Sequence, residues 1–152
     1  MPDMSLPLKE FSERLDEKEQ NHKKIILAVD DSPVILKSVS SVLSDVYKVY
    51  MLSNPTKIEI TLKKIIPDLF LLDYQMPGIN GFELIQIIRS FKEHKNTPVI
   101  FLTSMRTPNI LTAAIALGAS DCLVKPCNPD VLRKKVARYI DDPYSTLFEK
   151  ME

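Results

Sequence analysis

Short apolar runs alternate along the chain with amphipathic stretches, and this alternation predicts repeated strand–helix units. Several runs are apolar at nearly every position, as expected of parallel strands that are buried on both faces. Between them, apolar residues recur at spacings of three and four, which is typical of one face of a helix. The predicted strands are residues 25–30, 46–52, 68–73, 99–103 and 121–124. Five such units predict an α/β fold with a doubly wound, five-stranded parallel sheet.

Residues that start and stop helices stand at the boundaries of these units. Ser32 is the predicted N-cap of the first helix, and Pro33 occupies its first turn. Gly118 is a natural stop for the fourth helix. The apolar faces cover residues 35–43, 58–66, 84–88 and 131–140, and the predicted entries to the second to fifth helices are Asn54-Pro55, Gly81, Thr107-Pro108 and Asn128-Pro129.

Length and charge limit the classes of protein to consider. A chain of 152 residues predicts one domain with a sizeable core. The net charge is zero, so the composition gives no overall electrostatic attraction to nucleic acid. No apolar run is long enough to span a bilayer, and residues 1–24 lack the apolar segment of a signal peptide. We therefore expect a cytoplasmic protein that binds neither membrane nor nucleic acid, with Cys122 and Cys127 as reduced thiols.

Three segments are predicted along the chain: a leader over residues 1–23, the β-α domain over 24–141 and a tail over 142–152. In the leader, Leu8, Phe11 and Leu15 are spaced three and four residues apart. This segment could be a frayed leader, or an amphipathic helix that packs on a partner or on a second copy of the chain. Both interpretations stay open, and the second leaves room for a homodimer.

Polar residues stand where the apolar runs end. Asp30 and Asp31 follow the first run, and Asp73 follows the third. Thr103 ends the fourth run, and Lys125 follows the fifth. The carboxyl ends of parallel strands meet at one edge of a sheet, where ligands bind in open α/β folds. The pattern therefore places three carboxylates, a hydroxyl and an ammonium group at one edge.

Such a cluster needs something to offset its charge. Two carboxylates about 4 Å apart repel each other by roughly 4 kcal/mol at an effective dielectric constant of 20. Protonation of one carboxylate is one solution, and a hard divalent cation such as Mg²⁺ is another. A carboxylate such as Asp73 can also attack phosphorus and form an acyl phosphate. Thr103 could donate to a phosphoryl oxygen, and Lys125 could balance its charge.

Four segments resemble the receiver domain of bacterial-type two-component response regulators. The resemblance covers about residues 24–140, and it implies a flavodoxin-like (βα)5 sheet with strand order 2-1-3-4-5. Asp73 precedes Thr103 by thirty residues and Lys125 by fifty-two, which agrees with the family. The matching segments are Ile26-Leu27-Ala28-Val29-Asp30-Asp31-Ser32, Asp68-Leu69-Phe70-Leu71-Leu72-Asp73-Tyr74-Gln75-Met76-Pro77-Gly78, Phe101-Leu102-Thr103-Ser104 and Gly118-Ala119-Ser120-Asp121-Cys122-Leu123-Val124-Lys125-Pro126.

The resemblance implies a phosphoryl acceptor rather than an enzyme. Asp73 would accept phosphate from a histidine kinase or a histidine phosphotransfer protein, and a downstream protein effector would bind the changed form. The implied cofactor is Mg²⁺, with Mn²⁺ as a substitute. The family's metal ligands fall on the side chains of Asp31 and Asp73, the backbone carbonyl of Gln75 and, through a metal-bound water, Asp30; its phosphoryl contacts fall on Thr103, the backbone at Ser104, and Lys125.

The chain also departs from the family pattern. Cys122 stands where the family usually has Tyr or Phe, so a rotating aromatic lever is missing or reduced. Asn80 stands where Asp is common, and we expect a turn residue with little effect. Gln75 and Met105 occupy two positions that tune how long the phosphate survives. We expect Met105 to lengthen that lifetime, because a thioether can only screen an attacking water.

Three other functions fit the sequence less well. A phosphatase of the haloacid-dehalogenase kind needs an acid two residues after its nucleophile, where this chain has Gln75. A flavodoxin-like cofactor binder needs a phosphate-cradling loop after the first strand, where this chain has two carboxylates. A scaffold that no longer takes phosphate stays open as the alternative. The basic face of the fifth helix, around Arg133 and Arg138, is expected to be a solvated surface.

Overall fold

A parallel sheet of five strands forms the centre of the molecule. The computed structural model describes residues 23–105 and 109–141. The strand order is β2-β1-β3-β6-β7, and every neighbouring pair in this sheet is parallel. This order equals the predicted 2-1-3-4-5, so the doubly wound, flavodoxin-like fold is confirmed. The strands are β1 (Ile25–Val29), β2 (Lys48–Leu52), β3 (Leu69–Asp73), β6 (Val99–Thr103) and β7 (Asp121–Val124).

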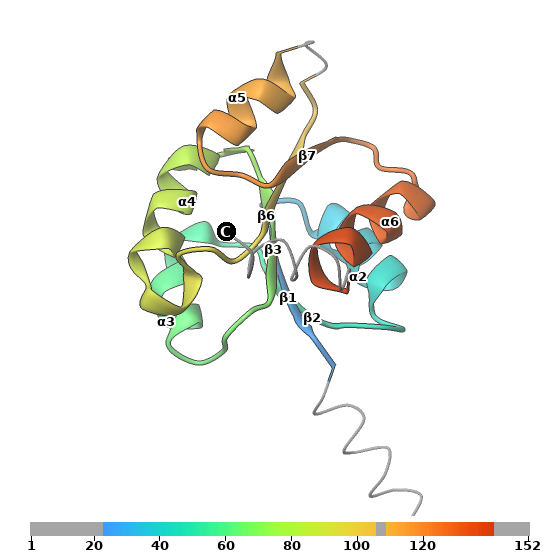
Figure 1. The fold of residues 1–152 in the computed structure, drawn as a ribbon, viewed down its shortest axis with the longest axis horizontal. Coiled ribbons are helices and arrows are strands. Elements are labelled where there is room, and N and C mark those ends of the chain that lie inside the picture. Colours follow the sequence, from blue (N-terminus) through green and yellow to red (C-terminus); the bar gives the residue numbers. More distant parts are fainter. Residues whose placement is uncertain (1–22, 106–108, 142–152) are drawn as a thin grey trace, which may run out of the picture.

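Helices cover both faces of this sheet. In Figure 1, where the sheet is seen edge-on, α2 and α6 lie on one side of it and α3, α4 and α5 lie on the other. This is the arrangement that alternating strands and helices require, because each crossover returns to a parallel neighbour. The helices are α2 (Pro33–Leu43), α3 (Ile58–Leu62), α4 (Gly81–Ser90), α5 (Ile110–Ala116) and α6 (Pro129–Ile140), with short 3-10 turns η1 (Pro55–Lys57) and η2 (Lys92–His94).

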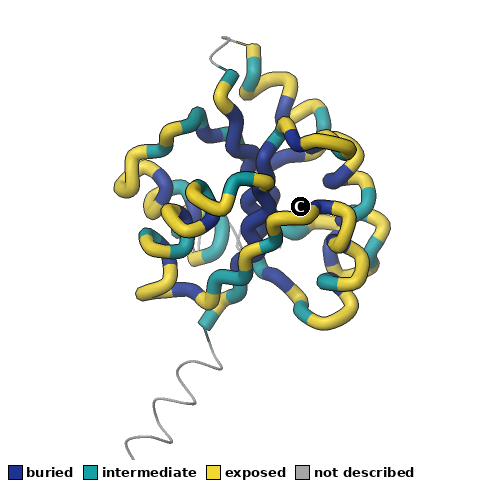
Figure 2. Tube along the Cα trace, turned by 180° about the vertical axis from the view of Figure 1, so that it is seen from behind, coloured by how far each residue is buried: buried dark blue, intermediate teal, exposed yellow. Residues whose placement is uncertain are grey.

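The central strands are buried on both faces. All five residues of β3 and all five of β6 are buried, which explains their near-continuous apolar sequence. Figure 2 shows this buried band in the middle of the molecule, with exposed residues on the outer sides of the helices. Successive side chains of a strand point to opposite faces, so the sheet separates two apolar clusters. Phe70 and Phe101 belong to the cluster under α3, α4 and α5, and Leu71 and Ile100 to the one under α2 and α6.

Polar side chains cap the starts of the helices, as the sequence predicts. Ser32 accepts a hydrogen bond from the backbone N–H of Ile35, and Pro33 follows it in the first turn of α2. Asn128 caps α6 in the same manner. Asn80 is more than a turn residue, because its side chain accepts a hydrogen bond of 2.8 Å from Glu83 N and caps α4.

Several element boundaries differ from those that the sequence predicts. Strand β2 begins at Lys48 instead of residue 46, since the backbone N–H groups of Val46 and Tyr47 both donate to Leu43 O at the end of α2. Helix α3 ends at Leu62 instead of continuing to residue 66, and Pro67 disfavours helical geometry at the last of the residues between them. A small antiparallel pair, β4 (Gln75–Met76) and β5 (Ile79–Asn80), follows Asp73 and was not predicted.

Part of the prediction lies outside the described residues. The leader up to residue 22, the entry of the fourth helix at Thr107-Pro108 and the tail from residue 142 belong there. Among the described residues, no helix is both long and apolar enough to cross a membrane.

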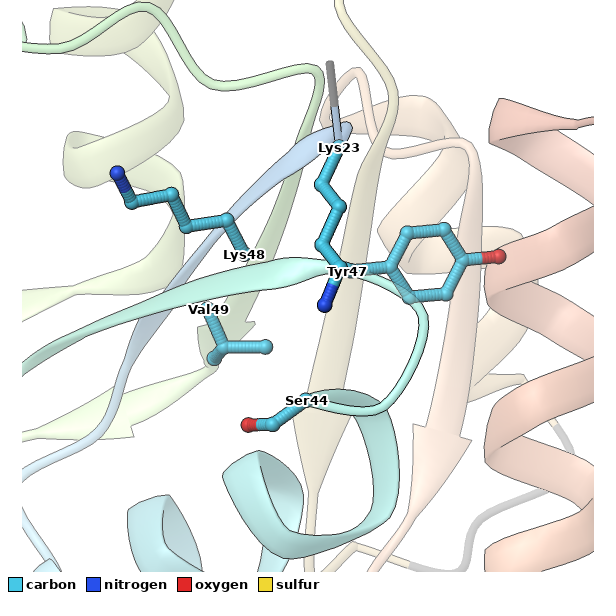
Figure 3. Close-up of a pocket in the computed structure, with 5 residues that line it drawn as sticks. All are labelled: Lys23, Ser44, Tyr47, Lys48 and Val49. Atoms are coloured by element: carbon cyan, nitrogen blue, oxygen red, sulfur yellow. The ribbon is translucent and has the colours of Figure 1, made fainter. Parts of the chain in front are cut away.

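A cavity of about 240 Å³ lies beside the first residues of β1 and β2. Figure 3 shows the five residues that line it, which are Lys23, Ser44, Tyr47, Lys48 and Val49. The Tyr47 hydroxyl group points away toward α6 and donates a hydrogen bond to Asp141. This cavity is at the amino end of the sheet, opposite the end at which the predicted site residues stand.

Candidate functional site

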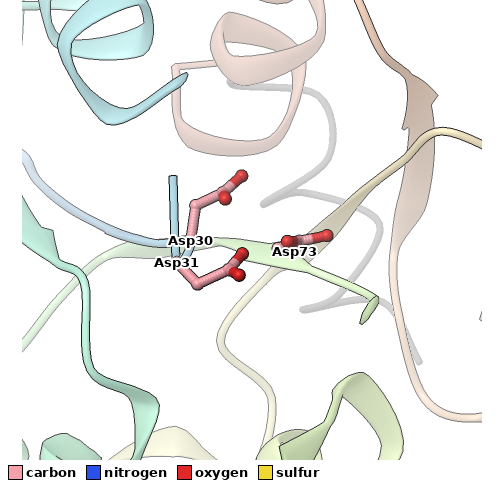
Figure 4. A group of neighbouring side chains, drawn as sticks. All are labelled: Asp30, Asp31 and Asp73. Atoms are coloured by element: carbon pink, nitrogen blue, oxygen red, sulfur yellow. The ribbon is translucent and has the colours of Figure 1, made fainter. Parts of the chain in front are cut away.

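Three carboxylates meet at the carboxyl ends of β1 and β3. Oxygen atoms of Asp30, Asp31 and Asp73 all lie within 4.8 Å of one another, and Figure 4 shows the three side chains gathered at this edge. The parallel pairing of β1 with β3 brings them together, because Val29 pairs with Leu72 directly before them. Asp30 and Asp73 are buried, whereas Asp31 is exposed. The predicted carboxylate cluster is therefore present in the structure.

Asp30 is held by two hydrogen bonds, one on each carboxylate oxygen. Its Oδ1 accepts from the backbone N–H of Ser32 at 2.9 Å, and its Oδ2 accepts from Lys125 Nζ at 2.7 Å. Because α2 starts directly after Ser32, the helix start and the carboxylate stabilise one another. Asp31 lies next to it in sequence but faces the exposed side of the cluster.

Lys125 joins two of the carboxylates. Its Nζ lies 2.7 Å from Asp30 Oδ2 and 3.2 Å from Asp73 Oδ1. The backbone fixes this position, since Lys125 N donates to Thr103 O at 2.7 Å as β7 ends beside β6. Burial opposes the charge on this ammonium group, but the hydrogen bonds and negative charges of both aspartates outweigh burial and raise the pKa of Lys125. The lysine therefore stays protonated at neutral pH.

The pKa of Asp73 is raised from 3.8 to about 6. Burial is the main cause, and the charge of Asp30 adds to it. Lys125 and the backbone N–H of Gln75, which donates to Asp73 Oδ1 at 3.2 Å, act in the opposite direction. At pH 7 and above the carboxylate is still mostly ionised, as a nucleophile must be.

Two loops meet beside Asp73. Thr103 is buried at the end of β6, and its hydroxyl oxygen accepts a hydrogen bond of 3.1 Å from Met105 N. The hydroxyl hydrogen is therefore left for another acceptor. The Gln75 side chain, at the start of β4, donates from Nε2 to Met105 Sδ at 3.4 Å. Ser104 follows Thr103 and is exposed.

Cys122 lies in β7, on the face of the sheet that α3, α4 and α5 cover. It pairs in register with Phe101 of β6 and packs, partly buried, against the apolar cluster on that face. Burial raises the pKa of its thiol, and the charge of Asp121 adds to that effect. A thiol that stays protonated packs as a small apolar group. The pKa of Cys127 is likewise raised by burial.

The donor set suits a hard divalent cation. Carboxylate oxygens are the ligands that Mg²⁺ and Mn²⁺ prefer, and three of them lie within reach of one ion. Asp31 is the most accessible of the three, while both oxygens of Asp30 already accept hydrogen bonds.

The fold brings most of the predicted site residues together, but two contacts were not foreseen. The predicted set of Asp30, Asp31, Asp73 and Lys125 forms one cluster. The Ser32 backbone N–H at Asp30 and the Gln75–Met105 contact were missed. A short sequence signal exists for the first, because a residue two positions after Asp commonly donates to its side chain. The second depends on how two loops face each other, which the sequence does not display.

Known proteins are similar to this chain in sequence. The sequence pattern of the response regulator receiver domain matches residues 26–137. The chain therefore belongs to the response regulator receiver domain family. This receiver domain is 31% identical over 117 residues to the two-component response regulator ORR6 of Oryza sativa, a match that covers 74% of this chain and 69% of ORR6. It is also 33% identical over 114 residues to protein RcaC of Microchaete diplosiphon.

Solved structures agree with this assignment. The receiver domain superposes on the chemotaxis response regulator CheY4 of Vibrio cholerae with a TM-score of 0.71 and 34% identity, covering 77% of this chain and 98% of CheY4. A CheY-like receiver domain protein from Methanospirillum hungatei gives a TM-score of 0.70 at 25% identity, covering 78% and 94%. Some curated relatives are much longer, since the match spans 18% of RcaC and 47% of the sensory transduction protein BceR.

Proposed function

We propose that this receiver domain takes a phosphoryl group onto Asp73 from the phosphohistidine of a histidine kinase or a histidine phosphotransfer protein. The observation that carries the proposal is the geometry around Asp73. This carboxylate is buried beside two other carboxylates and lies 3.2 Å from the Lys125 ammonium group. The two aspartates already balance the charge of this ammonium group, and its position also suits the charge of a phosphoryl group on Asp73.

In the transfer step, an Asp73 carboxylate oxygen attacks phosphorus. A P–O bond forms as the P–N bond to the donor imidazole breaks, and the imidazole nitrogen takes up a proton. Lys125 lies close to Asp73 and would offset the negative charge of the phosphoryl oxygens after the transfer. Thr103 can donate its hydroxyl hydrogen to a phosphoryl oxygen, because its oxygen already accepts from Met105 N.

Magnesium is the metal that the donor set fits best, with Asp31, Asp73 and the Gln75 carbonyl as ligands and Asp30 acting through water. When bound, it would offset the negative charge shared by carboxylates and phosphoryl oxygens. Hydrogen bonds within the protein hold the carboxylates in place. The Ser32 N–H and Lys125 fix Asp30, and the Gln75 N–H orients Asp73. We propose that the protein is a switch rather than an enzyme, acting in the cytoplasm.

Phosphorylation would be transmitted through the loop after Thr103 to the face formed by α5, β7 and α6. Helix α5 exposes Leu111 and Ile115, one turn apart, with 43% and 52% of their surfaces accessible. A protein effector or a second copy would bind this face. Cys122 has less surface to bury than an aromatic ring, so the switch would rely on the Thr103 loop and the helix that follows it.

The direct test is intact-protein mass after incubation with acetyl phosphate and Mg²⁺. We expect one phosphate adduct that is stable in acid, labile in base and lost when Mg²⁺ is chelated. Asp73→Asn should take no adduct, and Asp31→Asn should take it only at much higher Mg²⁺. An unmodified parent protein that demonstrably binds Mg²⁺ would contradict the proposal and favour a phosphate-independent scaffold.

A further inference from the structure

A thioether and an amide meet at the exposed rim of the carboxylate site. Gln75 Nε2 lies 3.4 Å from Met105 Sδ, and this contact joins the start of β4 to the loop after β6. The backbones of the same two residues hold groups of the proposed site. Gln75 N donates to Asp73 Oδ1, and Met105 N donates to Thr103 Oγ1. The sulfur atom is therefore held, partly exposed, by a residue whose backbone N–H donates to the proposed phosphate acceptor.

We propose that Met105 is an oxidation site through which a peroxide shortens the lifetime of the phosphate on Asp73. This inference rests on the proposed function and adds a form of regulation to the same site. Met105 is partly exposed, whereas Met76 is 8% exposed and shielded from an oxidant in solution. Met51 is 50% exposed on the edge strand β2, so it should react as well and serves as an internal comparison.

The chemical step is a two-electron oxidation. The Met105 sulfur attacks one oxygen of hydrogen peroxide, an S–O bond forms and the O–O bond breaks. The products are methionine sulfoxide and one molecule of water, so the sulfur is oxidised and the peroxide is reduced. The change is reversible, because methionine sulfoxide reductases restore the thioether.

Oxidation replaces an apolar screen by a strong hydrogen-bond acceptor. A thioether sulfur is a weak acceptor that holds the Gln75 amide but does not order water well. A sulfoxide oxygen is polar and hydrated, so it brings an ordered water close to the phosphoryl group. We expect hydrolysis to be faster by about threefold to tenfold, the rate equivalent of one net hydrogen bond.

The experiment first measures the phosphate adduct on the untreated protein. It then compares the hydrolysis rate of that adduct with the rate in protein exposed to hydrogen peroxide. Peptide mass locates the added oxygen, and loss of the phosphate adduct gives the hydrolysis rate. Oxidised parent protein should lose phosphate faster, Met105→Leu should not respond to peroxide, and Met51→Leu should respond like the parent. Treatment with methionine sulfoxide reductase should restore the slow rate, which separates this effect from oxidation of Cys122 or Cys127.

The outcomes are distinguishable. No adduct on the untreated protein overturns the proposed function, and the inference with it. An adduct whose hydrolysis is unchanged or slower after Met105 is oxidised overturns the inference alone. So does an acceleration that persists in Met105→Leu, or a Met105 that stays unoxidised while Met51 reacts.

Discussion

At the scale of single residues, neighbours in sequence have opposite environments. Asp30 is 1% exposed with both oxygens in hydrogen bonds, whereas Asp31 is exposed. Both carboxylates belong to the same cluster, but the start of α2 and the Lys125 side chain enclose Asp30 alone. Asp30 thereby meets Lys125 from the other edge of the site, and Asp31 is left accessible to a cation.

Met105→Glu should shorten the lifetime of the acyl phosphate. A carboxylate in place of the thioether can act as a general base for the attacking water, so we expect hydrolysis to be about tenfold faster or more. The measurement is loss of the phosphate adduct by intact-protein mass after the phosphodonor is removed. Met51→Glu makes the same change on the edge strand β2 and should leave the rate as it is. An unchanged hydrolysis rate in Met105→Glu would contradict the prediction that the thioether protects the phosphate.

The carboxylates, the hydroxyl and the ammonium group were predictable because each follows a strand that the sequence reveals as an apolar run. The contacts among these groups were less predictable from the sequence. That Lys125 would contact Asp30 at 2.7 Å and Asp73 at 3.2 Å depends on the side-chain packing at the end of β7. The Gln75–Met105 contact depends on how the short strand β4 and the loop after β6 face each other, which no periodicity describes.

At the scale of elements, α6 is tied to the amino end of β7 by an ion pair between a buried aspartate and a half-buried lysine. Lys135 Nζ lies 2.7 Å from Asp121 Oδ2, and the Tyr139 hydroxyl lies 3.0 Å from the same oxygen and from Ser120 O. Asp121 is 4% exposed. Burial alone would raise its pKa, but the hydrogen bonds from Lys135, Cys122 N and Tyr139 outweigh burial, so the pKa of Asp121 is lowered.

Asp121→Asn should therefore destabilise the fold. It leaves Lys135 without its charge partner, and we expect a loss of about 1–3 kcal/mol in the free energy of unfolding at pH 7. The matched control is Asp130→Asn, because the Asp130–Arg133 pair is exposed and such pairs contribute about 0–1 kcal/mol. Urea unfolding of both variants measures the difference.

The pH dependence of this loss has a defined sign. A carboxyl group whose folded pKa lies below 3.8 contributes stability above that pH, and the contribution disappears as pH falls through the folded pKa. The difference in the free energy of unfolding between Asp121→Asn and the parent should thus become smaller below about pH 4. A gap of equal size for Asp121→Asn and Asp130→Asn at pH 7 would show that burial adds nothing to this ion pair.

The order of the strands in the five-stranded sheet and of the helices between them was predictable, whereas their lengths were not. The apolar periodicity continues through Ile65 and Ile66, which suggests a longer third helix, but α3 ends at Leu62. Ile65 still packs on the core without being helical, and Ile66 is 61% exposed. Apolar spacing reports which residues reach the core, whereas Pro67 only limits how far the helix can extend.

At the scale of the whole molecule, the site and the stability of the fold are in conflict. The pKa of Asp73 is raised to about 6 by burial and by Asp30. A carboxyl group whose folded pKa exceeds its unfolded value contributes its full stability below pH 3.8, and this is lost as pH rises through about 6. At neutral pH and without a divalent cation, the ionised carboxylate that phosphoryl transfer needs therefore weakens the folded state.

Asp73→Asn should for this reason stabilise the protein at pH 7.5 in the presence of a chelator, by about 1–3 kcal/mol. The amide keeps the shape of the side chain and can still accept from Gln75 N, but it carries no charge to oppose that of Asp30. The advantage should shrink as pH falls from about 6 toward 4, because the parent then protonates Asp73. His94, whose pKa burial lowers, is common to both proteins, so its titration cancels in the difference. Urea unfolding at several pH values measures this difference, and adding Mg²⁺ should reduce it by stabilising the parent. If Asp73→Asn is less stable than the parent at pH 7.5 without metal, the ion pair with Lys125 outweighs the repulsion from Asp30, and the conflict between site and fold does not exist.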